Sequence, residues 1–141
     1  MKNIVLLMCG KNKFSSKTRV KDLYISERFQ KSIEYARQIT SEDNIFVLSA
    51  KHGLLELEKE IEPYDKSIYN MDNIEKIEWA NNVINQLEKY SNINEDKYIF
   101  LTDNFYCQDI YKNLINYELP LNGLSNNDHK KWFIEKINNN E

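Results

Sequence analysis

Three clusters of chemically reactive side chains each follow a short apolar run in this sequence. Cys9-Gly10-Lys11 supplies a thiol and an ammonium group, and "SAKHG" at 49–53 supplies a hydroxyl, an ammonium group and an imidazole. Thr102-Asp103-Asn104 supplies a hydroxyl, a carboxylate and an amide. Side chains of these types bind anions, transfer protons and attack electrophiles. Whether they act together depends on the helices and strands that carry them.

The cluster at 49–53 combines the most functional groups. We interpret Lys51 as a ligand for a phosphate or carboxylate, and His52 as a residue that transfers a proton near neutral pH. Ser49 could donate a hydrogen bond to an anion or act as a weak nucleophile, which needs an adjacent base. Gly53 suits a backbone position with positive φ or a close backbone approach. The alternative is an ordinary turn, with an exposed lysine and a histidine packed under the loop.

Cys9 precedes two lysines in the run Cys-Gly-Lys-Asn-Lys. Because nearby cations favour the thiolate, Cys9 is a candidate nucleophile or redox-sensitive thiol. The alternative is a small buried residue at a strand end. Lys11, Lys13, Lys17 and Arg19 could form an anion-binding loop, although the sequence has neither a Walker pattern nor G-x-G-x-x-G. A solvated, flexible basic loop fits the same composition.

The remaining candidates lie in "EPYD" and after the third apolar run. Glu62, Tyr64 and Asp65 could close the site, with Glu62 or Asp65 as a general acid/base or as the partner of a ribose hydroxyl. Alternatively, Tyr64 anchors its loop on the body of the protein. Asp103 is either a carboxylate of the site or the N-cap of the next helix. Asn104 could reach the edge of a base.

The histidines and cysteines form no metal-binding pattern. His52 and His129 are far apart in the sequence, and neither Cys9 nor Cys107 belongs to a CxxC pair. We therefore expect no metal and no cofactor. We expect His129, which precedes two lysines, on the surface. Cys107 falls on the apolar face of a predicted helix and is expected in the core.

Composition and charge indicate one globular domain. The chain has 141 residues, of which 41% are hydrophobic and 29% charged, and its net charge is -3. Residues 1–21 carry six basic side chains and no acidic one, whereas the rest of the chain is acidic. This distribution suits a focused anion site better than a broad nucleic-acid track. No apolar run is long enough for a membrane span, and we expect a cytoplasmic protein.

Three apolar runs have the length and composition of buried strands: Ile4–Met8, Asn44–Leu48 and Tyr98–Leu101. A fourth short strand could cover Glu118–Leu121. Their alternation with helical patterns predicts an α/β fold, a three-layer sandwich around a mainly parallel, Rossmann-like sheet of about four strands. Ligands of such sheets bind beyond the carboxyl ends of the strands. The three polar clusters should therefore share one edge.

Helix signals lie between these strands. Ser26 and Asp72 are good N-caps and predict helices that run to about Thr40 and Tyr90. A third helix should begin directly after residue 104, and a fourth should cover Asp128–Ile137. The predicted inner face of the second helix consists of four apolar side chains: Ile77, Ala80, Ile84 and Leu87.

The 23 residues from Ser49 to Met71 show no convincing helix or strand pattern. Connections of this length in a compact domain are usually functional or mobile. Because the segment contains Pro63 and Tyr64, we expect an ordered loop over the site. The alternative is a short helical turn around Leu54–Glu60.

The second strand and its loop, "FVLSAKHGLLELEKEIEPYD", resemble the signature of the YaaA peroxide-stress protein family. "IVLLMCGKNK" and "IFLTDNFY" lie where that family has its first strand with a lysine-bearing loop and its third strand. The chain is more similar still to a group of small uncharacterised bacterial and phage domains, which share Cys-x-Lys-x-Lys, "DLY", "LSAKHGLL" and "EPYD". The resemblance implies a compact α/β fold, a cytoplasmic location and a link to oxidative stress and DNA protection. This chain lacks the helix-hairpin-helix-like insertion associated with DNA binding in YaaA-like members.

Taken together, the residues and the resemblance predict a cleft for a small anionic, nucleotide-like or nucleobase-containing ligand. The first hypothesis is a YaaA-like protein that binds or acts on nucleotides or nucleic-acid bases, as in base or nucleotide modification or glycosidic-bond chemistry. In its enzymatic form, lysines hold phosphate, His52 or an acid such as Asp103 moves a proton, and Cys9 or a water molecule attacks. The alternative is a non-catalytic DNA-binding stress-response protein that uses the loop Lys11–Lys21. A third hypothesis is recruitment of a host partner by the acidic surface. The sequence leaves open whether catalysis occurs and what the oligomeric state is.

Overall fold

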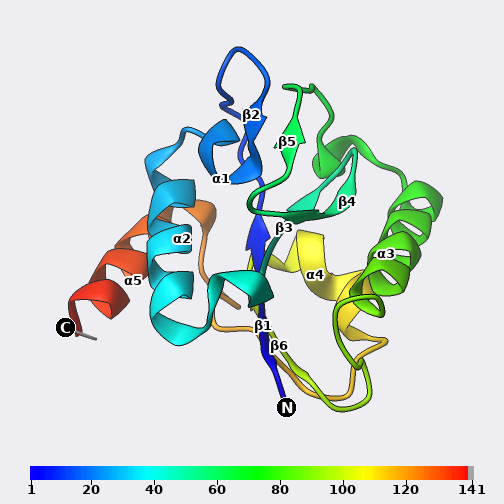
Figure 1. Cartoon of the computed structure of the whole chain (residues 1–141). Coiled ribbons are helices and arrows are strands. Elements are labelled where there is room, and N and C mark those ends of the chain that lie inside the picture. Colours follow the sequence, from blue (N-terminus) through cyan, green and yellow to red (C-terminus); the bar gives the residue numbers. More distant parts are fainter. Residues whose placement is uncertain (140–141) are drawn as a thin grey trace.

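A computed structural model describes residues 1–139 of the chain and shows a central sheet with helices on both faces (Figure 1). The sheet has five strands in the order β4-β3-β1-β6-β7. Four strands are parallel: β1 (Asn3–Met8), β3 (Ile45–Ser49), β6 (Lys97–Leu101) and β7 (Tyr117–Glu118). The fifth strand, β4 (Gly53–Glu56), is antiparallel to β3. The predicted α/β sandwich with a mainly parallel sheet is confirmed.

Two layers of helices bury the two faces of the sheet. α1 (Val20–Leu23), α2 (Glu27–Ile39) and α5 (Asn126–Asn139) cover one face, and α3 (Asn73–Leu87) and α4 (Asn104–Tyr111) cover the other (Figure 1). Because successive strand residues point to opposite faces, Leu6 packs toward α3 and α4 while Val5 and Leu7 pack toward α2. Each buried side chain of this size contributes about 1.5–3 kcal/mol. This two-sided burial explains the continuously apolar sequence of β1.

The helix starts follow from the predicted caps. The Ser26 Oγ accepts a hydrogen bond from Phe29 N at 3.2 Å, and the Asp72 Oδ1 accepts one from Glu75 N at 2.8 Å. Such caps satisfy backbone donors that the first turn leaves unpaired. A short 3-10 helix, η1 (Glu42–Asn44), leads into β3. None of the helices within residues 1–139 is both long and apolar enough to cross a bilayer.

The segment from residue 49 to 71 differs from the prediction. The suggested helical turn at Leu54–Glu60 is wrong, because this stretch forms β4 and then enters β5 (Glu60–Ile61). β4 returns along β3 as a hairpin that buries Leu54 and Leu55, and β5 pairs with β2 (Thr18–Arg19) in a separate two-stranded ribbon. A 3-10 helix, η2 (Ile68–Asn70), ends the segment. The leucines of β4 are therefore buried because β4 pairs with β3 at the edge of the sheet.

Three further expectations are corrected by packing. Ile77 is 50% exposed, and Lys76, Trp79 and Val83 lie on the inner face of α3 with the other predicted residues. The rotation of about 100° per residue puts position 76, not 77, above the sheet. The fourth parallel strand is only Tyr117–Glu118. His129 is completely buried rather than on the surface, whereas Cys107 is buried as expected.

Candidate functional site

The carboxyl ends of β1, β3 and β6 lie at one edge of the sheet because these strands are neighbours and parallel. A cavity of about 780 Å³ opens at this edge, beyond β1. Its volume falls in the range of about 300–1,000 Å³ that is usual for small-ligand sites. Five segments line it: residues 8–13, Ser26 with Arg28 and Phe29, residues 65–67 with Tyr69 and Asn70, Tyr106 of α4, and Asn126 of α5.

The cavity lining carries four cationic side chains and one carboxylate. Lys11 and Lys13 come from the loop after β1, Arg28 comes from the first turn of α2, and Lys66 lies beside Asp65 before η2. The N-terminus of α2 adds the positive end of its helix dipole, since Ser26 is also in the lining. The surplus of positive charge favours an anionic ligand.

Arg28 lies in the cavity wall and, among residues 1–139, forms no ion pair with a carboxylate. Its Nη2 donates a hydrogen bond to His129 Nδ1 at 2.7 Å, and its guanidinium lies 5.7 Å from the centroid of Phe133. Its Nε is buried and has no hydrogen-bond partner within residues 1–139. Burial lowers the pKa of Arg28, and Asp103 acts in the opposite direction. An arginine side chain nevertheless stays charged, so the cavity wall contains a positive charge that forms no ion pair among the described residues.

Cys9 is half-buried in the same wall, and its Sγ lies 3.2 Å from Tyr106 Oη. Burial raises the pKa of Tyr106, so its hydroxyl keeps a proton that it can donate. Tyr69 Oη donates a hydrogen bond to Asp103 Oδ2, while Asp103 Oδ1 accepts one from Tyr106 N and caps α4. Asp103 therefore supports two residues of the wall, although it is outside the cavity lining itself.

Ser49 and Tyr64 belong to a buried network of hydroxyl groups. Ser49 Oγ donates to Tyr64 Oη at 2.7 Å and accepts from His52 N at 3.2 Å. Tyr64 Oη also lies 2.5 Å from Tyr24 Oη, and burial raises the pKa of Tyr64. The network reaches the cavity through Lys13, whose Nζ lies 4.6 Å from the centroid of the Tyr64 ring. Both predicted residues thus support the site without being part of its lining.

Five other predicted site residues lie outside the cavity lining. Lys51 is exposed and His52 is half-buried in the turn that joins β3 to β4. Burial, and then the charge of Lys51, lower the pKa of His52 from its ordinary value of 6.5. Gly53 adopts the predicted positive φ, at 73°. Glu62 and Asn104 are both exposed. The structure thus brings Cys9, Lys11, Lys13 and Asp65 together in the cavity lining and gives the 49–53 cluster the form of a hairpin turn.

A comparison with protein families matches residues 4–135 to one model, described as "Family of unknown function (DUF6884)". The match spans most of the sequence. This chain belongs to the DUF6884 family. Neither curated proteins nor solved structures give a significant match to it. Family membership therefore brings no activity to the DUF6884 chain, and its function has to be inferred from the site.

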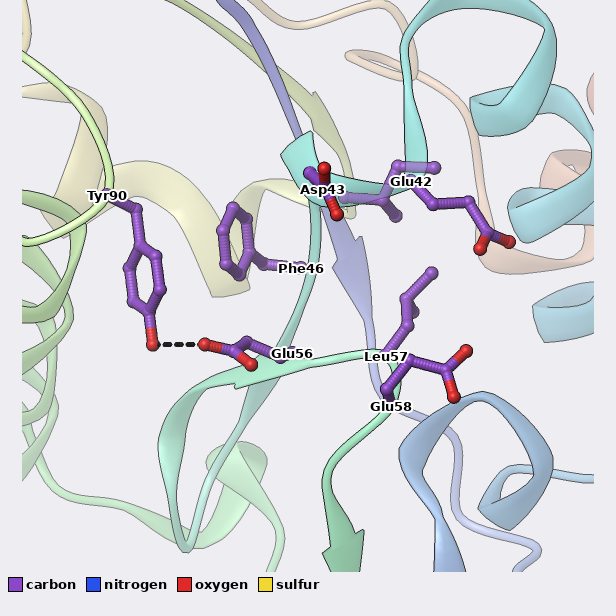
Figure 2. A pocket seen from close by; sticks show the side chains of 8 residues that line it. Glu42, Asp43, Phe46, Glu56, Leu57, Glu58 and Tyr90 are labelled. Atoms are coloured by element: carbon purple, nitrogen blue, oxygen red, sulfur yellow. Dashed lines mark hydrogen bonds between the residues drawn. The ribbon is translucent and has the colours of Figure 1, made fainter.

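The DUF6884 chain has a second, smaller hollow of about 280 Å³ between η1, β3 and β4 (Figure 2). Four acidic residues are part of its lining: Glu42, Asp43, Glu56 and Glu58. Most of these carboxylates already have partners. Tyr90 Oη donates to Glu56 at 2.5 Å, and Glu42 and Glu58 form ion pairs with Arg37 and Lys21. The hollow therefore offers a ligand less unpaired charge than the cavity beyond β1.

Sequence reasoning missed most of the polar lining residues of the DUF6884 cavity, among them Arg28, Tyr69, Tyr106 and Asn126. The position of Arg28 near the site could have been predicted from the sequence. A helix that follows a strand in a parallel sheet starts at the carboxyl edge, so the residues just after the Ser26 cap had to lie near the site. Tyr69 and Asn126 come from distant segments without such a rule. Within residues 1–139, no group of three or more side chains could hold a metal ion.

Proposed function

We propose that the cavity beyond β1 binds a small anionic ligand of nucleotide-like shape. The observation that carries this proposal is Arg28, a guanidinium in the cavity wall that has no carboxylate partner among the described residues. A partly buried charge is costly unless it is paired. A phosphate or carboxylate in the cavity would supply the missing counter-charge.

The cationic side of the cavity suits a phosphate group. Arg28 can offer Nη donors to a phosphate, and Lys11 adds a mobile point charge. Lys66 is also in the lining, but it is already paired with Glu75 at 3.3 Å. The first backbone N–H groups of α2 start at the same wall. Helix N-termini of this length bind anions through these groups. Arg28, Lys11 and the helix terminus thus act on the same ligand charge.

The aromatic part of the cavity lining suits a planar group. Tyr69 is 48% exposed, and its orientation is held by the hydrogen bond to Asp103 and by contacts with Phe105 and Tyr106 at centroid distances of 5.2 and 5.7 Å. A held, accessible aromatic ring is a stacking surface for a base. Asn70 in the same lining adds an amide that can pair with a base edge. These features support a nucleotide or nucleobase over inorganic anions.

The catalytic form of the proposal assigns the nucleophile to Cys9. Its Sγ lies in the wall of a cation-rich cavity, 3.2 Å from Tyr106 Oη, which can donate a hydrogen bond to it. The YaaA-like motifs point in the same direction, toward the handling of nucleotides or nucleic-acid bases. His52 has less support as the proton-transfer group, because it lies in the hairpin turn outside the lining.

Binding of a DNA backbone by the loop Lys11–Lys21 has less support. Arg19 and Lys21 form ion pairs with Glu58 at 3.4 and 2.7 Å. β2 in the same loop is paired with β5. Part of the basic segment is therefore already neutralised by the acidic body.

The proposal is tested by thermal unfolding at low salt with nucleoside monophosphates, nucleosides, free bases, inorganic phosphate and a short DNA duplex. A ligand at 100 times its Kd stabilises the folded state by about 2.7 kcal/mol, or roughly 8 °C for a chain of this size. We expect a nucleoside monophosphate to give such a shift in the wild type and in Lys51→Ala, the matched exposed control. Arg28→Met should abolish it.

Two results would contradict the proposal. One is a shift that survives in Arg28→Met, which would place the ligand elsewhere. The other is stabilisation by the DNA duplex alone, with affinity that falls steeply as salt rises, which is the signature of backbone binding.

A further inference from the structure

His129 on α5 is the hydrogen-bond partner of the cavity arginine on α2. Its side chain is completely buried, and its Nδ1 receives the hydrogen bond from Arg28 Nη2 at 2.7 Å. The contact is part of the packing of α2 against α5 (Figure 1). In the same packing, the centroid of the Phe133 ring lies 5.7 Å from the Arg28 Cζ. The pair joins residues 101 positions apart in the sequence.

The direction of this hydrogen bond defines the state of the imidazole. A guanidinium has donors only, so Nδ1 has to accept and cannot carry a proton. The single proton of a neutral imidazole is then on Nε2, which is buried and has no partner among the described residues. His129 therefore binds Arg28 as a neutral acceptor.

The charges around His129 are consistent with a neutral ring. Burial, and then the charge of Arg28, lower its pKa from the ordinary value of 6.5. Asp103 at the start of α4, the Leu124 backbone and Asp128 on α5 raise the pKa, each less strongly than burial or Arg28 lowers it. Neither carboxylate forms an ion pair with the ring or with Arg28 among the described residues.

We propose that His129 is a positioning residue of the anion site, which holds the Arg28 guanidinium in the cavity wall without neutralising it. This role rests on the proposed function of the cavity. An aspartate at the same place would also orient the arginine, but it would cancel the charge that the ligand needs. An apolar residue would leave the charge and lose the orientation. A neutral acceptor meets both requirements.

The role is tested with three variants of the full chain and inorganic phosphate as the probe, titrated by NMR at pH 7.5. His129→Asn keeps a neutral acceptor near the position of Nδ1, and we expect phosphate affinity within about threefold of wild type. His129→Leu removes the acceptor and should weaken binding about tenfold. His129→Asp is nearly identical in shape to His129→Asn but is charged, and it should weaken binding by about tenfold or more.

If His129 has only a structural role, the phosphate affinities of the variants should follow a different order. If His129 only fills space between α2 and α5, the Asn and Asp variants should bind alike, and that result would overturn the inference. Equal binding by wild type and His129→Leu would overturn it as well. Glu27→Gln is the matched control, because it removes the neighbouring α2–α5 ion pair with Lys130, at 3.1 Å, without touching Arg28. It should bind phosphate as the wild type does.

A second measurement needs no ligand. The ¹⁵N shifts of the imidazole should show Nε2 protonated and Nδ1 unprotonated, and the Arg28 Nε–H signal should broaden in His129→Leu but not in His129→Asn. A proton on Nδ1 would overturn the inference even if phosphate binds. Conversely, if no anion binds the wild type while these signals are as expected, the proposed function fails and the contact between His129 and Arg28 stands.

Discussion

Gly53→Ala tests how the 49–53 turn is held. Gly53 has a φ of 73°, and a Cβ at this position would lie 2.3 Å from Gln86 Oε1 and 3.1 Å from Asn82 Nδ2. The Gln86 side chain forms two hydrogen bonds with the backbone here. Its Oε1 accepts one from Leu54 N at 2.8 Å, and its Nε2 donates one to His52 O at 3.2 Å. A methyl group would therefore strain the backbone and displace the side chain that caps this part of β4.

The two effects can be given sizes. An L-residue in the left-handed region costs about 1–2 kcal/mol. Displacing Gln86 removes two hydrogen bonds, each with a net contribution of about 0.5–1.5 kcal/mol. Gly53→Ala should thus reduce the free energy of unfolding by about 2–5 kcal/mol. Gly123 is the matched control: its φ is 87° and nothing lies within 4 Å of an added Cβ, so Gly123→Ala should cost only the backbone part.

Urea denaturation of the single and double variants separates the two effects. We expect Gly53→Ala to cost about 1–3 kcal/mol more than Gly123→Ala. In a Gln86→Ala background this difference should nearly disappear, because the displaced bonds are already absent. Equal costs of the two glycine substitutions in the wild-type background would refute the reasoning, since the contact with Gln86 would then contribute nothing.

Two further predictions concern buried basic groups. Lys76 is buried between Asp109, at 3.5 Å, and the ring of Phe105, and its Nζ has no hydrogen bond to the part of the chain that the structure describes. Because a buried ion pair can be replaced as a whole by well-packed apolar residues at little cost, the double variant Lys76→Met/Asp109→Leu should leave the free energy of unfolding within about 1 kcal/mol or raise it. A loss above about 2 kcal/mol in urea denaturation would contradict this. The second prediction is a loss of stability below pH 6.5. The pKa of His129 is lowered in the folded state, so the unfolded chain binds more protons as the pH falls. Melting curves from pH 7.5 to 5 should decline less in His129→Asn, and an unchanged slope would contradict the assignment.

Much of the fold could be predicted from local patterns. Apolar runs of strand length identified β1, β3 and β6, and the caps Ser26 and Asp72 located the starts of α2 and α3. These signals are local, because burial on both faces and capping each leave a mark in a few adjacent residues. β4 was missed because its leucines fit a helical turn as well as a strand, and only pairing with β3 distinguishes the two.

The sequence predicted where the candidate site lies, but it identified only some of the residues that line it. The rule that ligands bind beyond the carboxyl ends of parallel strands located the edge, and it brought Cys9, Lys11 and Lys13 to the cavity. The same rule failed for Lys51 and His52. Their strand turns back at once through Gly53, so that the residues after it form a hairpin instead of a wall.

What the sequence determined by itself is therefore the α/β class, the positions of the main elements and the edge at which polar groups gather. These follow from periodicity, length and capping, which act over a few residues. Only the tertiary structure decided that an arginine from α2, without an ion pair among the described residues, lies in the cavity wall and that a histidine 101 residues away accepts its hydrogen bond. The reason is physical: burial of His129 and the lack of an ion pair at Arg28 within residues 1–139 arise from the packing of α5 on α2. No local pattern specifies which side chains meet across that contact.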